Sequence, residues 1–177
     1  MQTSSEKQAM DIRINVIHED DLNWIETSQG TAFRSRRKKL AGPAGARMLG
    51  ASIYELPPGA SAFPYHYHCA NEELLYVLSG EGSLRLGEEK FPVRAGSFVA
   101  MPPGPAHAHR LYNSSNAPLR YLCVSTMIDP EVAVYPDSHK VGVMAGSAPG
   151  GDPSKRTLAG VYREGSSVGY YDGEAGA

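Results

Sequence analysis

Cysteine is scarce in this chain of 177 residues, which contains only Cys69 and Cys123. Two cysteines cannot build the disulfide framework of a small secreted domain, and Cys123, within an apolar run, is expected to be a small buried residue. No stretch approaches the roughly 20 apolar residues that span a membrane. The polar segment Gln2–Gln8 also lacks the apolar core of a signal peptide. These absences predict a protein of the reducing cytoplasm.

A large charge of either sign is missing as well. The formal net charge is -2 and 20% of the residues are charged, so nothing indicates generic attraction to nucleic acid. No helix-turn-helix pattern occurs, which argues against direct control of transcription. We therefore expect a small-molecule ligand or substrate, with neither nucleic acid nor a membrane as a partner.

Turn-forming residues are abundant, with 19 glycines and 13 prolines. From about residue 48 onward, short apolar stretches such as Met48–Leu56 and Leu119–Thr126 alternate with Gly/Pro-rich turns. The unbroken apolar run Leu74–Leu78 predicts a strand covered on both faces. No long helical periodicity interrupts this pattern. It predicts an all-β fold, either an antiparallel sandwich or a barrel.

The two ends of the chain differ from this central region. Apolar and polar residues alternate over Ile12–Val16, which predicts one half-buried strand within an N-terminal extension, 1–33. The barrel is predicted over 34–130. The C-terminal extension, 131–177, is too short for a core of its own, so we expect it to pack on the barrel or on a partner chain. Because exposed sheet edges also need covering, these features predict a homodimer.

Histidines cluster around one short stretch. His66 and His68 are separated by one residue, so in a β-strand their side chains lie on the same face. Glu73 follows after four more residues, which is enough for the chain to turn and return alongside. Two imidazoles and a carboxylate that converge on one point suit a divalent transition metal. Two further histidines, His107 and His109, follow a Gly/Pro-rich turn later in the chain.

The spacing around these histidines resembles the two sequence motifs of the cupin superfamily, over roughly residues 48–126. The first pattern is Gly59, six residues, His66-x-His68, four residues, Glu73, six residues and Gly80, and the second is Gly96, five residues, Pro102-x-Gly104 and then histidine. This resemblance implies a double-stranded β-helix, or jelly-roll barrel, with a metal in one mouth. Two histidines and the glutamate of the first motif and a histidine of the second would hold that metal.

The fourth ligand depends on how the second motif is aligned. The spacing from Gly104 selects His107, whereas counting back from Asn113 selects His109. We favour His109. His107, two residues away on the same strand face, could instead be the ligand, could support the ligands from behind, or could bind substrate. A site of three imidazoles and one carboxylate suits Fe, Mn, Ni, Co or Zn as a divalent ion.

Further segments resemble a narrower group, the small single-domain bacterial cupins that are uncharacterised and sugar-phosphate isomerase-like. These segments are Arg34–Leu86, Tyr135–Ser138 and Tyr171–Glu174. The resemblance implies a metal-dependent enzyme that acts on a small polar substrate, by sugar-phosphate isomerisation or by dioxygenase chemistry. The alternative is a non-catalytic cupin that binds or senses a small molecule.

A basic run, residues 34–39, lies at the start of the predicted barrel. The simpler interpretation is a solvated segment at a sheet edge. The alternative is a rim that holds an anionic ligand, and either this run or Arg110 could receive a phosphate.

Overall fold

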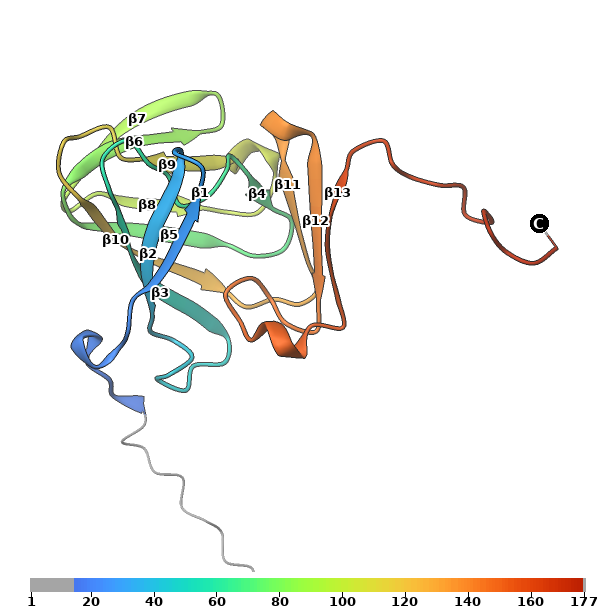
Figure 1. Ribbon diagram of the computed structural model, residues 1–177, viewed down its shortest axis with the longest axis horizontal. Helices are drawn as coiled ribbons and strands as arrows, with labels where there is room; N and C mark the ends of the chain where they lie inside the picture. The colour runs from blue at the N-terminus through green and yellow to red at the C-terminus, as the bar shows by residue number, and fades with distance from the viewer. Residues whose placement is uncertain (1–14, 177) are drawn as a thin grey trace, which may run out of the picture.

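The computed structural model describes residues 15–176, which fold mostly into β-strands (Figure 1). The strands are β1 (Ile25–Gln29), β2 (Phe33–Lys39), β3 (Leu49–Leu56), β4 (Tyr67–His68), β5 (Glu73–Ser79), β6 (Glu81–Leu86), β7 (Glu89–Arg94), β8 (Phe98–Met101), β9 (His109–Tyr112), β10 (Leu119–Thr126), β11 (Glu131–Tyr135), β12 (Lys140–Ala145) and β13 (Leu158–Arg163). The short 3₁₀ helices are η2 (Glu19–Asp21), η3 (Pro105–His107), η4 (Pro136–Ser138) and η5 (Pro153–Lys155). Within residues 15–176, none of the helices has the length and apolar character needed to cross a membrane.

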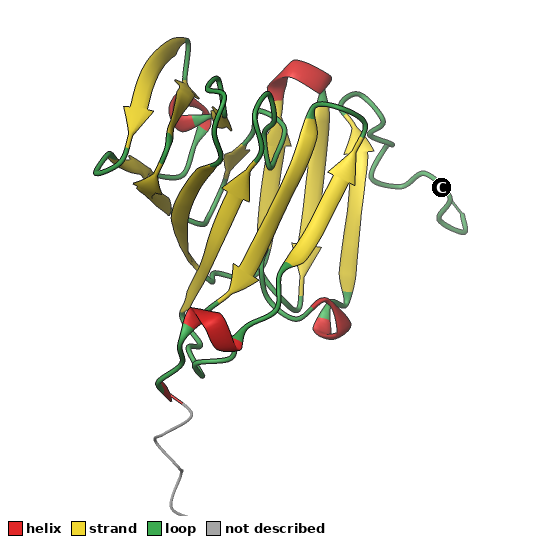
Figure 2. Cartoon of the chain, turned by 60° about the vertical axis from the view of Figure 1, so that its left-hand side comes forward, coloured by secondary structure: helices red, strands yellow, loops and turns green. Residues whose placement is uncertain are grey.

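The strands form two facing layers, and the short helical turns of the described residues lie in the connections at the strand ends (Figure 2). One layer is a six-stranded sheet in the order β1-β2-β3-β10-β5-β8. The other combines the sheets β7-β6-β9 and β13-β12-β11-β4, which a bridge between His66 and His109 connects. The predicted all-β jelly roll is confirmed. The bridge also brings two histidines of the sequence motifs together.

The hydrophobic core lies between the six-stranded sheet and β7-β6-β9, where alternate residues of each strand point inward. On β5, Leu75 and Val77 are 3% and 0% exposed, whereas Tyr76 and Leu78 are 41% and 39% exposed. The prediction that Leu74–Leu78 is covered on both faces is therefore wrong within this chain. An antiparallel sheet packs one face on the core, and its other face is free to meet solvent or a partner.

The turn between β5 and β6 explains one glycine of the first motif. Gly80 has φ 81°, a conformation that side chains with a Cβ rarely adopt. A Cβ at this position would also lie 2.4 Å from the carbonyl oxygen of Pro118. Glycine is required here by both the backbone conformation and the close approach of the neighbouring chain.

The basic run forms β2, which lies between β1 and β3 rather than at an edge. Lys38 is 7% exposed, and its Nζ donates to the carbonyl oxygen of Glu19 at 2.7 Å while lying 5.0 Å from the centre of the Trp24 ring. The expectation of an edge segment is wrong, because β1 pairs along the outer side of β2, and Lys38 is buried against the segment around η2.

The ends of the chain also differ from the sequence pattern. The strand expected over Ile12–Val16 falls largely outside the described residues, and Val16 is exposed and belongs to no strand. At the other end, β11 pairs with β4 of the same chain, and β12 and β13 continue that sheet. Residues 164–176 extend away from the barrel (Figure 1). The division into 1–33, 34–130 and 131–177 stays a prediction.

Candidate metal centre

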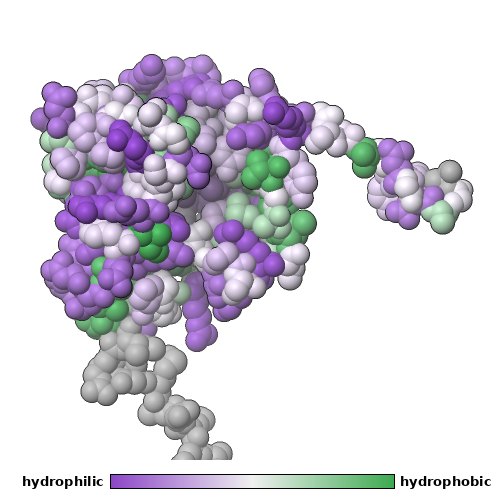
Figure 3. Space-filling view, in the orientation of Figure 1, coloured by the Kyte–Doolittle hydropathy of each residue, from purple (hydrophilic) through white to green (hydrophobic). Residues whose placement is uncertain are grey.

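A cavity of about 780 Å³ lies between the six-stranded sheet and the strands β11 and β12. Tyr54 of β3 and Tyr135 of β11 line it from opposite sides, and His66, His68 and Glu73 line its buried part. Figure 3 shows the surface hollowed between these two groups of strands. The candidate ligands of the first motif therefore face a space large enough for a small molecule.

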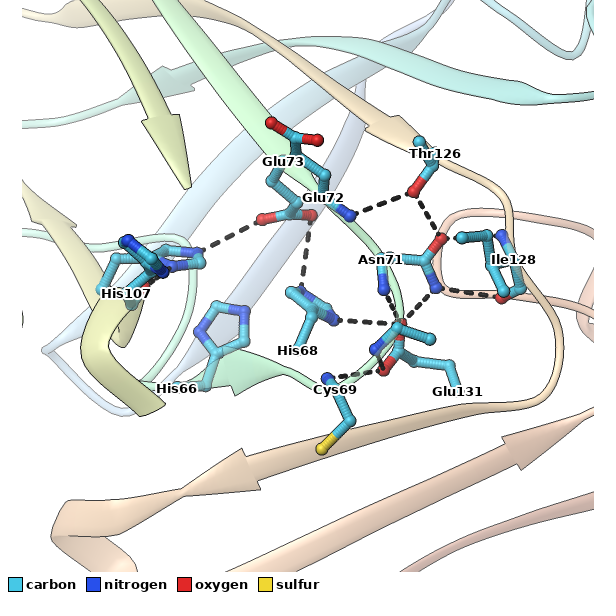
Figure 4. Close-up of polar contacts among 12 residues, drawn as sticks. His66, His68, Cys69, Asn71, Glu72, Glu73, His107, Thr126, Ile128 and Glu131 are labelled. Atoms are coloured by element: carbon cyan, nitrogen blue, oxygen red, sulfur yellow. Dashed lines mark hydrogen bonds and ion pairs between the residues drawn. The ribbon is translucent and has the colours of Figure 1, made fainter. Parts of the chain in front are cut away.

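Short elements around β4 position the three residues of the first motif (Figure 4). His68 ends β4, Glu73 begins β5, and His66 exchanges two backbone hydrogen bonds with His109. The potential ligand atoms of His66, His68 and Glu73 all lie within 4.8 Å of one another, and both histidines are buried. The structure brings together the three side chains that the spacing singled out.

His109 joins this group from β9. Its Nε2 lies 3.2 Å from Oε2 of Glu73, and its ring centre is 4.6 Å from that of His66. The His68 ring centre is farther away, at 6.3 Å. Three imidazoles thus surround the Glu73 carboxylate, and His109 is the histidine of the second motif that contacts it.

His107 occupies a different position. It ends η3, a turn that begins at Pro105 and stops before β9 starts at His109. The expectation that His107 shares a strand face with His109 is wrong, because a 3₁₀ turn does not alternate its side chains as a strand does. The His107 backbone carbonyl, however, lies 2.9 Å from Nδ1 of His109 and can accept its hydrogen.

His66 and His109 each have a backbone carbonyl oxygen within hydrogen-bond distance of Nδ1, which leaves Nε2 for the centre. Nδ1 of His66 lies 2.9 Å from the Pro64 carbonyl oxygen, and Nδ1 of His68 lies 3.7 Å from Oε2 of Glu131. Among the described residues, both ring nitrogens of His68 are buried without a hydrogen-bond partner, and its Nε2 lies 3.5 Å from Oε1 of Glu73. Metal-binding histidines commonly have this outer partner, since it fixes the ring and the tautomer. An orphaned buried nitrogen beside an ionised carboxylate fits a divalent metal.

Glu131 is a residue of the candidate site that sequence reasoning missed. Its side chain is 0% exposed, and its carboxylate accepts hydrogen bonds from the backbone N–H groups of Cys69, Ala70, Asn71 and Val132, at 2.9–3.2 Å, and from the Asn71 side-chain amide. These bonds fasten the turn between β4 and β5, which carries His68 at one end and Glu73 at the other. The only sequence signal was a lone glutamate at the start of an apolar strand.

Asn71 extends the same network to the end of β10. Its Nδ2 donates to the Ile128 carbonyl oxygen at 2.9 Å, and its Oδ1 accepts from the Thr126 hydroxyl at 3.0 Å and from the Ile128 N–H at 2.7 Å (Figure 4). With both ends of its amide satisfied and 2% of its surface exposed, Asn71 ties the ligand-bearing turn to the six-stranded sheet.

Burial and neighbouring charges give these groups different proton affinities. Burial lowers the pKa of His66 to about 4, and the adjacent His109 adds to the effect. Burial alone would lower the pKa of His68, but the carboxylates of Glu131 and Glu73 outweigh it and raise that pKa to about 9. Burial would raise the pKa of Glu73, yet its contacts with His109 and His68 hold it well below its ordinary value. A metal binds neutral imidazoles and an ionised carboxylate, so His68, unlike His66, would release a proton when a metal binds at neutral pH.

Residues 52–125 match the family model of the cupin domain. The matched segment includes His66, His68, Glu73 and His109, and the jelly-roll fold agrees with this match. Among curated proteins, "Uncharacterized protein MJ1618" of Methanocaldococcus jannaschii is 38% identical over 68 residues, which are 38% of this chain and 53% of that protein. The chain thus matches about half the length of this relative.

Two solved structures resemble the chain over most of its length. A candidate sugar phosphate isomerase from Acidithiobacillus ferrooxidans has a TM-score of 0.71 and 25% identity, with 86% of this chain and 94% of that chain covered. A sugar phosphate isomerase of the cupin superfamily from Silicibacter pomeroyi has a TM-score of 0.72 and 23% identity, with 89% and 98% covered. Both likenesses extend well beyond residues 52–125.

Proposed function

We propose that His66, His68, Glu73 and His109 bind one divalent transition metal, which is Fe, Mn, Ni, Co or Zn. The observation that carries the proposal is the convergence of three imidazoles on the Glu73 carboxylate, with the ligand atoms of His66, His68 and Glu73 within 4.8 Å of one another. His107 contributes through its backbone carbonyl, which holds the His109 ring. Four protein ligands would leave positions open toward the cavity.

We further propose that the chain is an enzyme that acts on a small polar substrate, of the sugar-phosphate isomerase type. The similarity at 25% identity to a candidate sugar phosphate isomerase supports this reaction class. A bound metal would act as a Lewis acid on a carbonyl or hydroxyl oxygen of the substrate. The protein's part is to fix the ligands, to hold the substrate between Tyr54 and Tyr135, and to keep Glu73 ionised. Dioxygenase-type chemistry uses the same kind of ligand set and is the second enzymatic candidate.

Turnover can be tested with the iron-loaded and the manganese-loaded protein. We expect interconversion of aldose and ketose phosphates in a panel of sugar phosphates, measured by NMR, and no oxygen uptake with catechol or thiol substrates. Loss of the isomerase signal in Glu73→Gln would serve as the control, since this change removes the carboxylate but keeps the side chain's size. Oxygen uptake instead would support the dioxygenase, and binding of panel members without turnover would support the non-catalytic alternative.

We also propose that the protein works as a cytoplasmic homodimer. One exposed apolar surface that a partner could cover is the outer face of β5 and β8, where Tyr76, Leu78 and Phe98 are 41%, 39% and 63% exposed. Light scattering at micromolar concentration should report about twice the chain mass of 19.0 kDa. A measured mass of 19.0 kDa, that of a single chain, would contradict the proposal.

A further inference from the structure

Basic side chains gather around the cavity that contains the candidate metal centre. Its lining includes Arg37, Lys39, Arg47 and Lys155, against two carboxylates, Glu73 and Asp152. Glu73 belongs to the metal centre, and Asp152 lies exposed at η5, where its Oδ1 accepts hydrogen bonds from the backbone N–H and the hydroxyl of Ser154. This excess of positive charge contrasts with the formal net charge of -2 of the whole chain.

The alternation of β2 divides its four consecutive basic residues into two pairs. On the outer face, Arg36 pairs with Glu55 at 2.7 Å and Lys38 donates to the Glu19 carbonyl oxygen at 2.7 Å. On the face toward the cavity, neither Arg37 nor Lys39 forms an ion pair with any residue in the described range 15–176.

Arg37 is held in place without being neutralised. Its Nη1 donates to the Tyr54 hydroxyl at 3.3 Å, and its Nε is buried without a hydrogen-bond partner among the described residues. An unpaired buried donor on a cation is costly unless a ligand or ordered water satisfies it. Arg37 with its free donor, and Lys39 beside it on the same face of β2, are suited to a phosphate or a carboxylate.

The strand register gives the separation between these cations and the metal centre. Lys39 is opposite Ser52, Ser52 is opposite Cys123, and Cys123 is opposite Leu75. These are three steps between neighbouring strands, so the backbones of Lys39 and Leu75 lie about 14 Å apart along the sheet. Glu73 lies two residues from Leu75 and on the same face of β5. The span suits a small molecule with two different ends better than a single ion.

We infer that Arg37 and Lys39 form an anion subsite, and that the ligand of this cavity carries a phosphate or carboxylate group at the end away from the histidines. The placement of the ligand's other end at the histidines rests on the proposed metal centre. The anion subsite itself does not depend on that proposal. Arg47 and Lys155 line the same cavity and add favourable potential for an approaching anion.

Calorimetric titration with inorganic phosphate and with acetate tests the subsite. The full chain is used as purified and after removal of metal with a chelator, so that a metal cannot account for binding. We expect at least one of the two anions to bind both forms, less tightly as ionic strength rises, and the tighter one identifies the class of ligand. The double substitution Arg37→Gln with Lys39→Gln should weaken binding about 10-fold or more, since it removes two charge-assisted contacts.

Arg36→Gln is the matched control, because it removes the same charge from the opposite face of the same strand and should leave the affinity within about 2-fold. Arg47→Gln, at an exposed position, should weaken binding a few-fold without endangering the fold. The inference is overturned if neither anion binds, or if the double variant, shown to be folded by circular dichroism, binds as well as the native chain. If the chain binds an anion but cannot bind a metal, the proposed metal centre is contradicted and the anion subsite is supported.

Discussion

Alanine in place of Glu131 should lower the free energy of unfolding by about 3–5 kcal/mol. The substitution leaves the backbone N–H groups of Cys69, Ala70, Asn71 and Val132 without their buried acceptor, and each such loss is costly. Urea denaturation followed by circular dichroism measures the change. Glu131→Gln keeps one side-chain oxygen as an acceptor, so its free energy of unfolding should fall by less than that of Glu131→Ala.

The stabilisation that Glu131 contributes should decrease at acidic pH. Burial would raise the pKa of this carboxyl, but His68 and Asn71 lower it from its ordinary value of 4.5 to about 2. A lowered pKa in the folded state means stabilisation that is complete above pH 4.5 and lost as the pH falls toward 2. The difference in free energy of unfolding between the native chain and Glu131→Ala should therefore become smaller as the pH falls from 4.5 toward 2. Glu88→Ala, at an exposed position, is the control. If Glu131→Ala and Glu88→Ala lose the same free energy of unfolding, the role assigned to Glu131 is contradicted.

Replacing His109 with alanine should weaken metal binding by more than about 100-fold, whereas His107→Ala should weaken it by less than about 10-fold. The reason is that His109 offers Nε2 to the centre, while His107 contributes a backbone carbonyl that alanine retains. Competition with a chelating indicator dye measures both affinities. A larger loss in His107→Ala would show that the spacing from Gly104 was the better guide to the ligand.

The fold was largely predictable because its signals are local. Short apolar stretches between glycine and proline turns gave the strands, and the Gly80 turn shows why that position cannot vary. The errors arose where tertiary contacts decide. An apolar run such as Leu74–Leu78 looks the same whether one face or both are covered, and a basic run such as residues 34–39 does not reveal that β1 and η2 lie against it.

The candidate site shows the same limit. His66, His68 and Glu73 are close in sequence, so their spacing alone indicated that they converge. Glu131 lies 58 residues beyond Glu73 in the chain and reaches the centre only because β11 pairs with β4. Likewise, strand alternation separates Arg37 and Lys39 from Arg36 and Lys38, but only the packing of β2 shows which pair faces the cavity. Long-range pairing brings these residues to the cavity, and no local pattern encodes it.

Elemental analysis of the native chain, purified without added metal and then reconstituted in turn with each of the five candidate ions, tests the central claim most directly. The account predicts about one equivalent of a divalent transition metal per chain, and strongly reduced metal in Glu73→Gln analysed beside it. A native chain that stays metal-free through every reconstitution, or a Glu73→Gln variant that retains a full equivalent, would contradict the assignment of a metal centre to His66, His68, Glu73 and His109.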